Sequence, residues 1–178
     1  MRIQIQRTSP GNQIYSCVGP RHACKKPINR SRCVVYAALI EIHITVFTDG
    51  SWCPYTKAYG YAVWIRDGQK PIHMFGAGGF GGRDSYHVES MGLAEAVKYI
   101  LENCSVAERV LIIQCDNIGA LNALDIKQFK KLGAKFVKRK HVKAHTSHKT
   151  NRSKVNNLVD NLAGQYMREY RAKVRAGK

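Results

Sequence analysis

Two aspartates stand directly after stretches of the sequence that read as strands. Asp49 follows His43–Thr48, and Asp116 follows the almost continuously apolar run Val110–Cys115. A run of that kind is typical of a central strand covered on both faces. If the two strands are parallel neighbours, both carboxylates emerge at the same sheet edge, where α/β folds commonly bind ligands. The simpler interpretations are an Asp-Gly turn at Asp49 and a helix cap at Asp116.

Two further acids fall on predicted helices that pack on the same sheet. At about 100° per residue, Glu89 projects within the apolar helix face that also carries Ala96 and Ile100. Asp160 lies at the margin of the apolar face of the last helix, from which it can point past the core toward a sheet end. A carboxylate on a buried face is costly unless it is paired, protonated or bound to metal.

Taken together, the four acids predict a metal site. Each has a commoner structural role when considered alone, but clustered carboxylates repel one another unless cations neutralise them. Oxygen ligands of this hard type select Mg²⁺ or Mn²⁺. Two such ions can activate a water molecule and stabilise the leaving oxygen of a hydrolysed phosphodiester. We therefore expect Asp49, Glu89, Asp116 and Asp160 to share one metal centre.

The elements that must position these acids follow the order βββαβαβα. Alternating patterns predict three initial strands, the second and third joined by an Asp67-Gly68 turn and the third followed by a flexible glycine-rich loop. The strands are expected at His43–Thr48, Tyr59–Ile65, Pro71–Phe75, Val110–Cys115 and 135–145. The helices are expected at Val88–Asn103, Ile118–Leu124 and Ile126–Leu132, with a last one capped by Ser153 and running to Val174. This order predicts an α/β fold with a mixed five-stranded sheet and helices packed on it.

The charge of the chain favours a polyanionic partner. The 178 residues hold 29 Lys and Arg against 12 Asp and Glu, which gives a net charge of +17. Such an excess most often serves nucleic-acid binding, and the alternative is a basic protein without a specific partner. The longest apolar stretch, CVVYAALIEIHITVF, is interrupted by Glu41 and His43 and is too short to span a membrane. We expect a monomer with no membrane association.

Residues 1–40 are predicted to be a disordered basic extension, separate from a catalytic domain at residues 41–175. They contain seven Lys or Arg, no acid, and the breakers SPGN and GPRH. The composition resembles an organelle transit peptide, but it fits equally a nucleic-acid-binding arm or an extended gene start outside the mature protein. Without import, we expect a cytoplasmic protein.

The cysteines give no clear metal motif. Cys17, Cys24 and Cys33, even with His22, lack the C-x-x-C pair of a typical zinc site. Cys104 and Cys115 fall at a helix end and in a strand, which suits reduced thiols.

With these motifs in order, residues 42–172 resemble a type 1 ribonuclease H. The matching motifs are FTDGS with Asp49, HVESMGLAEAV with Glu89, IIQCDN with Asp116, VKAH with His145, and NNLVDNLA with Asp160. The resemblance implies the ribonuclease H-like fold. It also implies an endonuclease that cuts the RNA strand of RNA/DNA hybrids with two Mg²⁺ ions, leaving 5′-phosphate and 3′-hydroxyl ends. Mn²⁺ is the alternative ion.

The resemblance also implies a role for individual residues. The four acids would be metal ligands, and His145 would assist proton movement or product release. His148 is the alternative, because the loop after the VKAH motif is longer than the usual family connection. The expected substrate-binding residues are Gly50, Ser51, Asn117 and Lys143.

Three features depart from the family pattern. WCPYTKAYG replaces an Asn-containing loop, Ser85–His87 replaces paired asparagines, and the span from Asp116 to His145 leaves no room for a long basic handle. Because those asparagines help to read the RNA 2′-hydroxyl, metal-dependent cleavage is predicted more firmly than strict hybrid preference. Binding would rest on KFVKRKHVK, Lys149, Arg152, Lys154 and the last helix. A relative that cuts DNA junctions and a non-catalytic binding module are the competing interpretations.

Overall fold

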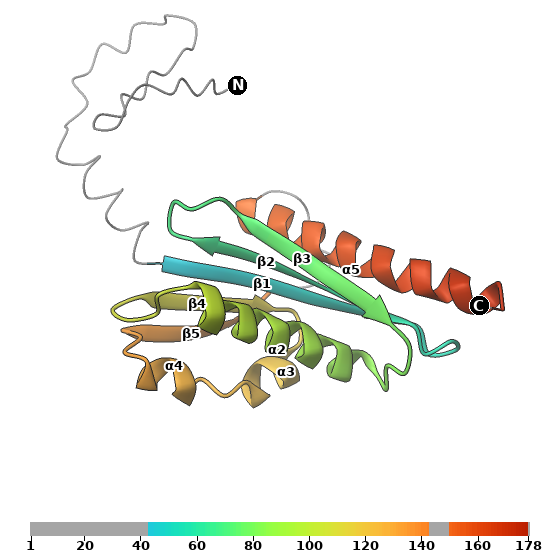
Figure 1. The fold of residues 1–178 in the computed structure, drawn as a ribbon, viewed down its shortest axis with the longest axis horizontal. Coiled ribbons are helices and arrows are strands. Elements are labelled where there is room, and N and C mark those ends of the chain that lie inside the picture. Colours follow the sequence, from blue (N-terminus) through green and yellow to red (C-terminus); the bar gives the residue numbers. More distant parts are fainter. Residues whose placement is uncertain (1–42, 143–149, 178) are drawn as a thin grey trace, which may run out of the picture.

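The central strand of the sheet is β1, His43–Trp52, which carries Asp49. The computed structural model describes residues 43–142 and 150–177, and the order of the five strands is β3-β2-β1-β4-β5 (Figure 1). The other strands are β2 Tyr59–Asp67, β3 His73–Gly79, β4 Val110–Cys115 and β5 Phe136–His141. Strands β1, β2 and β3 form an antiparallel meander, whereas β4 is parallel to both β1 and β5. The predicted mixed five-stranded sheet is therefore confirmed.

Helices cover the two faces of this sheet unequally. Helix α2, Ser85–Asn103, packs on β1 and β2. Of the two short helices, α3, Ile118–Ala123, contacts α2, β4 and β5, and α4, Lys127–Lys131, contacts β5. The long helix α5, Asn151–Arg175, lies on the opposite face against β1, β2 and β3 (Figure 1). Two apolar cores result. The larger one lies under α2, and the smaller one, around Phe47, Trp64 and Val159, lies under α5.

The predicted glycine loop after the third strand begins later than expected, because β3 extends through Gly79 and only Gly81 and Gly82 fall in the loop before α2. A Cβ atom on Gly76 would lie 2.7 Å from the Tyr166 ring, and one on Gly78 would lie 2.7 Å from the Tyr170 ring. Both tyrosines belong to α5. The glycines therefore leave room for the α5 tyrosines to pack against the edge strand, a non-local role that local composition does not reveal.

Several predicted boundaries also change. Helix α2 begins at Ser85 rather than Val88, and its N-cap is Asp84, whose side chain accepts a hydrogen bond from the His87 amide at 2.7 Å. The cap of α5 is Thr150 and not Ser153. Ser153 is instead the third residue of α5 and exchanges hydrogen bonds with Thr150 in a capping box.

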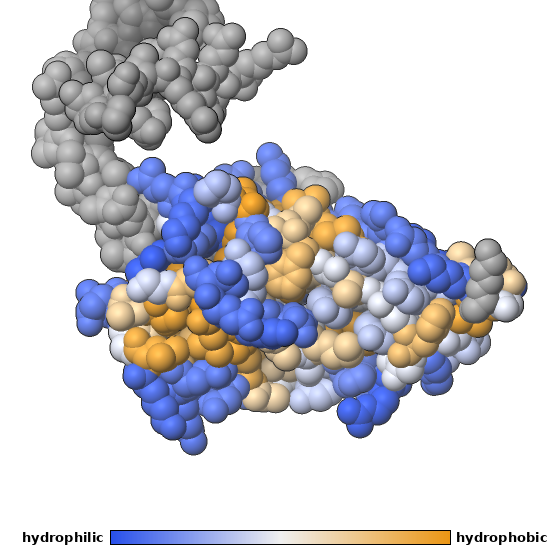
Figure 2. All heavy atoms as spheres, viewed as in Figure 1, coloured by the Kyte–Doolittle hydropathy of each residue, from blue (hydrophilic) through white to orange (hydrophobic). Residues whose placement is uncertain are grey.

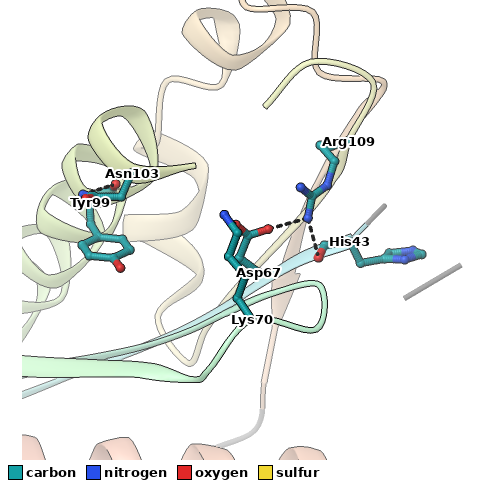
Figure 3. A network of polar contacts seen from close by, with 6 residues as sticks. All are labelled: His43, Asp67, Lys70, Tyr99, Asn103 and Arg109. Atoms are coloured by element: carbon teal, nitrogen blue, oxygen red, sulfur yellow. Dashed lines mark hydrogen bonds and ion pairs between the residues drawn. The ribbon is translucent and has the colours of Figure 1, made fainter. Parts of the chain in front are cut away.

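The end of the sheet far from Asp49 is tied together by a buried ion pair (Figure 3). Arg109, just before β4, donates hydrogen bonds to the Asp67 carboxylate at the end of β2 and to the His43 carbonyl at the start of β1. Lys70 forms an ion pair with the other Asp67 oxygen at 2.6 Å. Burial raises the pKa of Asp67, but the hydrogen bonds from Lys70 and Arg109 outweigh it, so the pKa is lowered overall.

The face of the molecule in Figure 2 is mainly hydrophilic, and its broadest apolar area lies toward the end where α2 finishes and α4 lies. Exposed apolar side chains on the elements near that end include Leu101, Leu132 and Phe136. No helix in the described part of the chain is long and apolar enough to cross a membrane. The proposed division between residues 40 and 41 falls outside the described residues, as does the cluster of Cys17, Cys24, Cys33 and His22, and these interpretations stay predictions.

Candidate metal centre

A main-chain amide joins two of the predicted acids. Gly50 donates hydrogen bonds to Asp49 Oδ1 at 2.7 Å and to Glu89 Oε1 at 2.9 Å. A Cβ atom on Gly50 would lie only 2.9 Å from the Glu89 nitrogen and 3.0 Å from a Val88 methyl group. Glycine at this position therefore lets β1 approach the N-terminal half of α2 closely enough for the two carboxylates to meet.

Glu89 lies on the face of α2 that packs on the sheet, as its helical position predicted, and is only 4% exposed. Its second oxygen, Oε2, accepts a hydrogen bond from the Cys115 thiol at 3.2 Å. The Cys115 sulfur in turn accepts one from the Asn117 amide at 3.4 Å. Both oxygens of Glu89 are therefore held in place, one by β1 and the other by β4.

Asp116 directly follows β4 and is half-buried beside this pair. A carboxylate oxygen from each of Glu89 and Asp116 and the Cys115 sulfur lie within 4.8 Å of one another. The Asp116 carbonyl accepts a hydrogen bond from His141 Nε2 at 2.9 Å, which links the ends of β4 and β5. Parallel pairing of β1 with β4 brings Asp49 and Asp116 to the same sheet edge.

Asp160 approaches the same cluster from the opposite face of the sheet. It is half-buried on α5, and its charge raises the pKa values of both Asp49 and Asp116. The four acids that the sequence singled out, from β1, α2, the end of β4 and α5, are thus close enough to interact electrostatically.

The cluster has the electrostatic character of a cation site. Burial, followed by repulsion from Asp116 and Asp160, raises the pKa of Asp49 to about 8. Burial and then Asp49 and Asp116 raise the pKa of Glu89 to about 9. A divalent cation would offset this repulsion and favour the ionised carboxylates. The oxygen-rich donor set therefore fits a hard divalent ion.

Three of the four predicted substrate-binding residues lie in the described part of the chain. Gly50 and Ser51 lie on β1 next to Asp49. Asn117 is the N-cap of α3, and its side-chain oxygen accepts a hydrogen bond from the Ala120 amide at 3.0 Å. Lys143 and His145 lie outside the described residues, as does His148, so their roles stay predictions.

Sequence reasoning missed the contact between Cys115 and Glu89. Strand alternation was the available signal, because Cys115 must face α2 if Leu111 and Ile113 do. Burial, and then the charge of Glu89, raises the pKa of the Cys115 thiol, which suits its role as a hydrogen-bond donor. Cys53, Cys104 and Cys115, the cysteines of the described part of the chain, are all free thiols.

Comparison with known proteins identifies the fold. No family model and no curated protein matches the chain. The N-terminal RNase H domain of Rv2228c from Mycobacterium tuberculosis matches 75% of this chain and 99% of its own, at 12% identity and a TM-score of 0.56. LC11-RNase H1, isolated from compost and solved in complex with an RNA/DNA hybrid, matches 71% of this chain and 97% of its own, at 14% identity and a TM-score of 0.53.

A third solved structure, the protease–reverse transcriptase of prototype foamy virus, matches 70% of this chain and 20% of its own, at 14% identity and a TM-score of 0.51. The described domain therefore has a ribonuclease H-like fold. At these identities the likeness concerns the fold, and the chemistry has to be argued from the residues of this chain.

Proposed function

We propose that the protein is a metal-dependent endonuclease that hydrolyses the RNA strand of RNA/DNA hybrids, leaving 5′-phosphate and 3′-hydroxyl ends. The observation that carries the proposal is the convergence of Asp49, Glu89 and Asp116 at one sheet edge, with Asp160 near them. A protein that only bound nucleic acid would gain nothing from clustered acids facing a polyanion. The likeness to LC11-RNase H1, which was solved with a hybrid, supports the choice of substrate.

The four acids would hold two Mg²⁺ ions, with Mn²⁺ as the alternative. Ions bound there would lower the pKa of a coordinated water and offset the charge that develops on the leaving oxygen. The protein's own contribution is to hold the carboxylates in position. Gly50 and Cys115 fix the two oxygens of Glu89, and the rigid strands β1 and β4 carry Asp49 and Asp116.

Basic residues next to this edge are suited to the phosphate backbone. Lys138 and Lys140 lie on β5, and Arg152 lies in the first turn of α5. Partial burial, and then the charges of Arg152 and Lys138, lowers the pKa of Lys140, so the three cations gather in one region. Phosphate contacts of this kind supply affinity and register, whereas base sequence is read elsewhere. By the resemblance, Lys143 would bind the substrate and His145 would help to move a proton.

The proposal also covers the oligomeric state of the protein, its location, its N-terminal extension and its contacts with the RNA strand. The protein would act as a monomer in the cytoplasm, and residues 1–40 would form an extension that the catalytic domain, residues 41–175, does not need. Gly50, Ser51 and Asn117 lie near enough to the acids to contact the backbone or the 2′-hydroxyl of the RNA strand.

One assay tests the activity against its alternatives. The full chain is incubated with end-labelled RNA/DNA hybrid, duplex RNA or duplex DNA, in Mg²⁺, Mn²⁺ or EDTA. Cleavage of the RNA strand in the hybrid alone, abolished by EDTA, is expected. Cleavage of DNA would make the protein a differently specific nuclease. Binding of hybrid without cleavage in either ion would make it a non-catalytic nucleic-acid-binding protein.

A further inference from the structure

A sulfur atom lies among the acids of the candidate metal centre. Cys115 is fully buried on β4, and its Sγ atom lies 3.2 Å from Glu89 Oε2. The same sulfur is within 4.8 Å of an Asp116 carboxylate oxygen. Mg²⁺ and Mn²⁺ prefer oxygen ligands and gain nothing from a thiol, whereas softer ions bind thiolates tightly. The centre therefore contains a donor that the proposed hard-ion chemistry does not use.

The spacing of these donors suits a tetrahedral ion. Zinc bonds of about 2.3 Å to sulfur and about 2.1 Å to oxygen, at the tetrahedral angle, put the two ligand atoms about 3.6 Å apart. The sulfur and Oε2 are already 3.2 Å apart in the protein. A shift of a few tenths of an ångström would let both bind one ion, and the half-buried Asp116 supplies a third ligand on the side open to solvent.

A buried hydroxyl beside the sulfur gives a second, independent indication. Thr48, the residue before Asp49 on β1, is 1% exposed, and its Oγ1 atom has no hydrogen-bond partner of normal geometry in the described part of the chain. The Thr48 side chain nevertheless lies beside Cys115, close enough to act on its thiol. A buried polar atom without a partner is uncommon in proteins, and a thiolate beside it would give its hydroxyl an acceptor.

We propose that Glu89, Cys115 and Asp116 form a mixed thiolate and carboxylate site that binds a thiophilic divalent cation, Zn²⁺ or Cd²⁺. Binding releases the thiol proton to water and turns the sulfur from a hydrogen-bond donor to Glu89 into a metal ligand. The Thr48 hydroxyl then donates a hydrogen bond to the thiolate. Because Glu89 and Asp116 are shared, the soft ion excludes the hard ions from the centre. This competition rests on the proposed function, whereas the soft-ion site does not.

Cadmium titration of the metal-free full chain tests the site without using activity. Thiolate coordination produces an ultraviolet sulfur-to-cadmium charge-transfer band, which is followed in the wild type and in Cys115→Ser. Loss of a residue that only supports a metal ligand typically weakens metal binding by roughly 10–100-fold. Loss of Cys115, a direct ligand, should weaken Cd²⁺ binding by at least as much. Cys104→Ser and Cys53→Ser are the matched controls, because both remove a free thiol that lies outside the acid cluster. Both controls should keep the Cys115-dependent band.

Competition with Mg²⁺ tests separately whether the soft and hard ions share ligands. Saturating Mg²⁺ should shift the Cd²⁺ titration of the wild type to higher Cd²⁺ and leave that of Cys115→Ser unchanged. An undiminished band in a folded Cys115→Ser variant would overturn the proposal. If that variant does not fold, Cys115→Ala takes its place, and an undiminished band in it would overturn the proposal. A Cys115-dependent band in a protein that cleaves no hybrid would support this site and refute the proposed nuclease. Cleavage of the hybrid by a protein that shows no such band would support the nuclease and refute this site.

Discussion

The Gly50 amide donates a hydrogen bond to Glu89 Oε1 at 2.9 Å, which joins β1 to the second turn of α2. This contact depends on the absence of a side chain at position 50, because a Cβ atom there would lie 2.9 Å from the Glu89 nitrogen. The geometry of the acid cluster therefore depends on a residue that is not itself acidic.

Gly50→Ala should push β1 and α2 apart. We expect a loss of about 1–3 kcal/mol in the free energy of unfolding, the usual consequence of overpacking, together with a large loss of hybrid cleavage. Gly92→Ala is the matched control. A Cβ atom at Gly92 meets only ordinary contacts, the nearest at 3.4 Å, and alanine favours the helix by up to about 1 kcal/mol. Urea unfolding and cleavage rates measure both effects, and equal behaviour of the two variants would contradict the account.

The stability of the metal-free protein should fall as the pH rises. Asp49 and Glu89 have folded-state pKa values of about 8 and about 9, raised from ordinary values of 3.8 and 4.5. Because the folded state holds these protons more tightly than the unfolded state does, their contribution is most favourable below about pH 4 and is lost progressively up to about pH 9. Thermal unfolding in EDTA at a series of pH values measures the trend.

Added Mg²⁺ should cancel much of that loss, because a bound cation favours the ionised carboxylates. Asp49→Asn serves as the control, since its amide does not titrate and the pH dependence should shrink. A metal-free protein whose stability is the same at pH 5 and pH 9 would show that the acids are not clustered as described.

The ion pair at the other end of the sheet predicts a purely structural effect. Asp67→Ala leaves the largely buried Arg109 guanidinium without its carboxylate partner and should destabilise the fold by about 1–3 kcal/mol. Lys70→Ala removes a mostly exposed partner of the same carboxylate and should destabilise the fold less than Asp67→Ala does. Chemical unfolding compares the two variants. Cleavage by the folded fraction of Asp67→Ala should match the wild type, and a specific catalytic defect would contradict the separation of the two ends.

The pH dependence of this pair has the opposite sign to that of the acid cluster. The pKa of Asp67 is lowered overall, so its contribution is present above its ordinary value of 3.8 and is lost as the pH falls through the folded-state pKa. The wild type should therefore lose more stability than Asp67→Ala on acidification below about pH 4. Equal losses in the two proteins would argue against a native ion pair.

The resemblance to the ribonuclease H motif predicts which histidine assists turnover. His145→Ala should slow cleavage by about 10²–10⁴-fold without abolishing it, the usual range for general acid–base help. His148→Ala should have a much smaller effect. Rates at saturating hybrid and Mg²⁺ decide the assignment, and a larger loss in the His148 variant would reverse it.

Much of the fold follows from local patterns. The apolar run of β4 and the alternation in β1 and β2 are produced by burial of one or both strand faces, so they are visible in the sequence. The helical position of Glu89 likewise predicted a buried acid, because periodicity defines the face of α2 that packs on the sheet.

Features that depend on distant partners did not follow in this way. The glycines of β3 locally indicate a loop, and their place in a strand depends on the α5 tyrosines that pack against them. The contact between Cys115 and Glu89 depends on how α2 sits along β4, which neither element specifies alone. The cap of α5 was placed three residues late because Thr150 and Ser153 are both good capping residues.

The central claim, that Asp49 belongs to a metal centre that cuts RNA in hybrids, is tested most directly by Asp49→Asn. Cleavage of a labelled RNA/DNA hybrid is measured in saturating Mg²⁺ alongside binding of the same hybrid. The account predicts that the variant folds at least as stably as the wild type, because carboxylate repulsion is relieved. It should bind the hybrid and show almost no cleavage. Wild-type rates in the variant at saturating Mg²⁺ would contradict the claim.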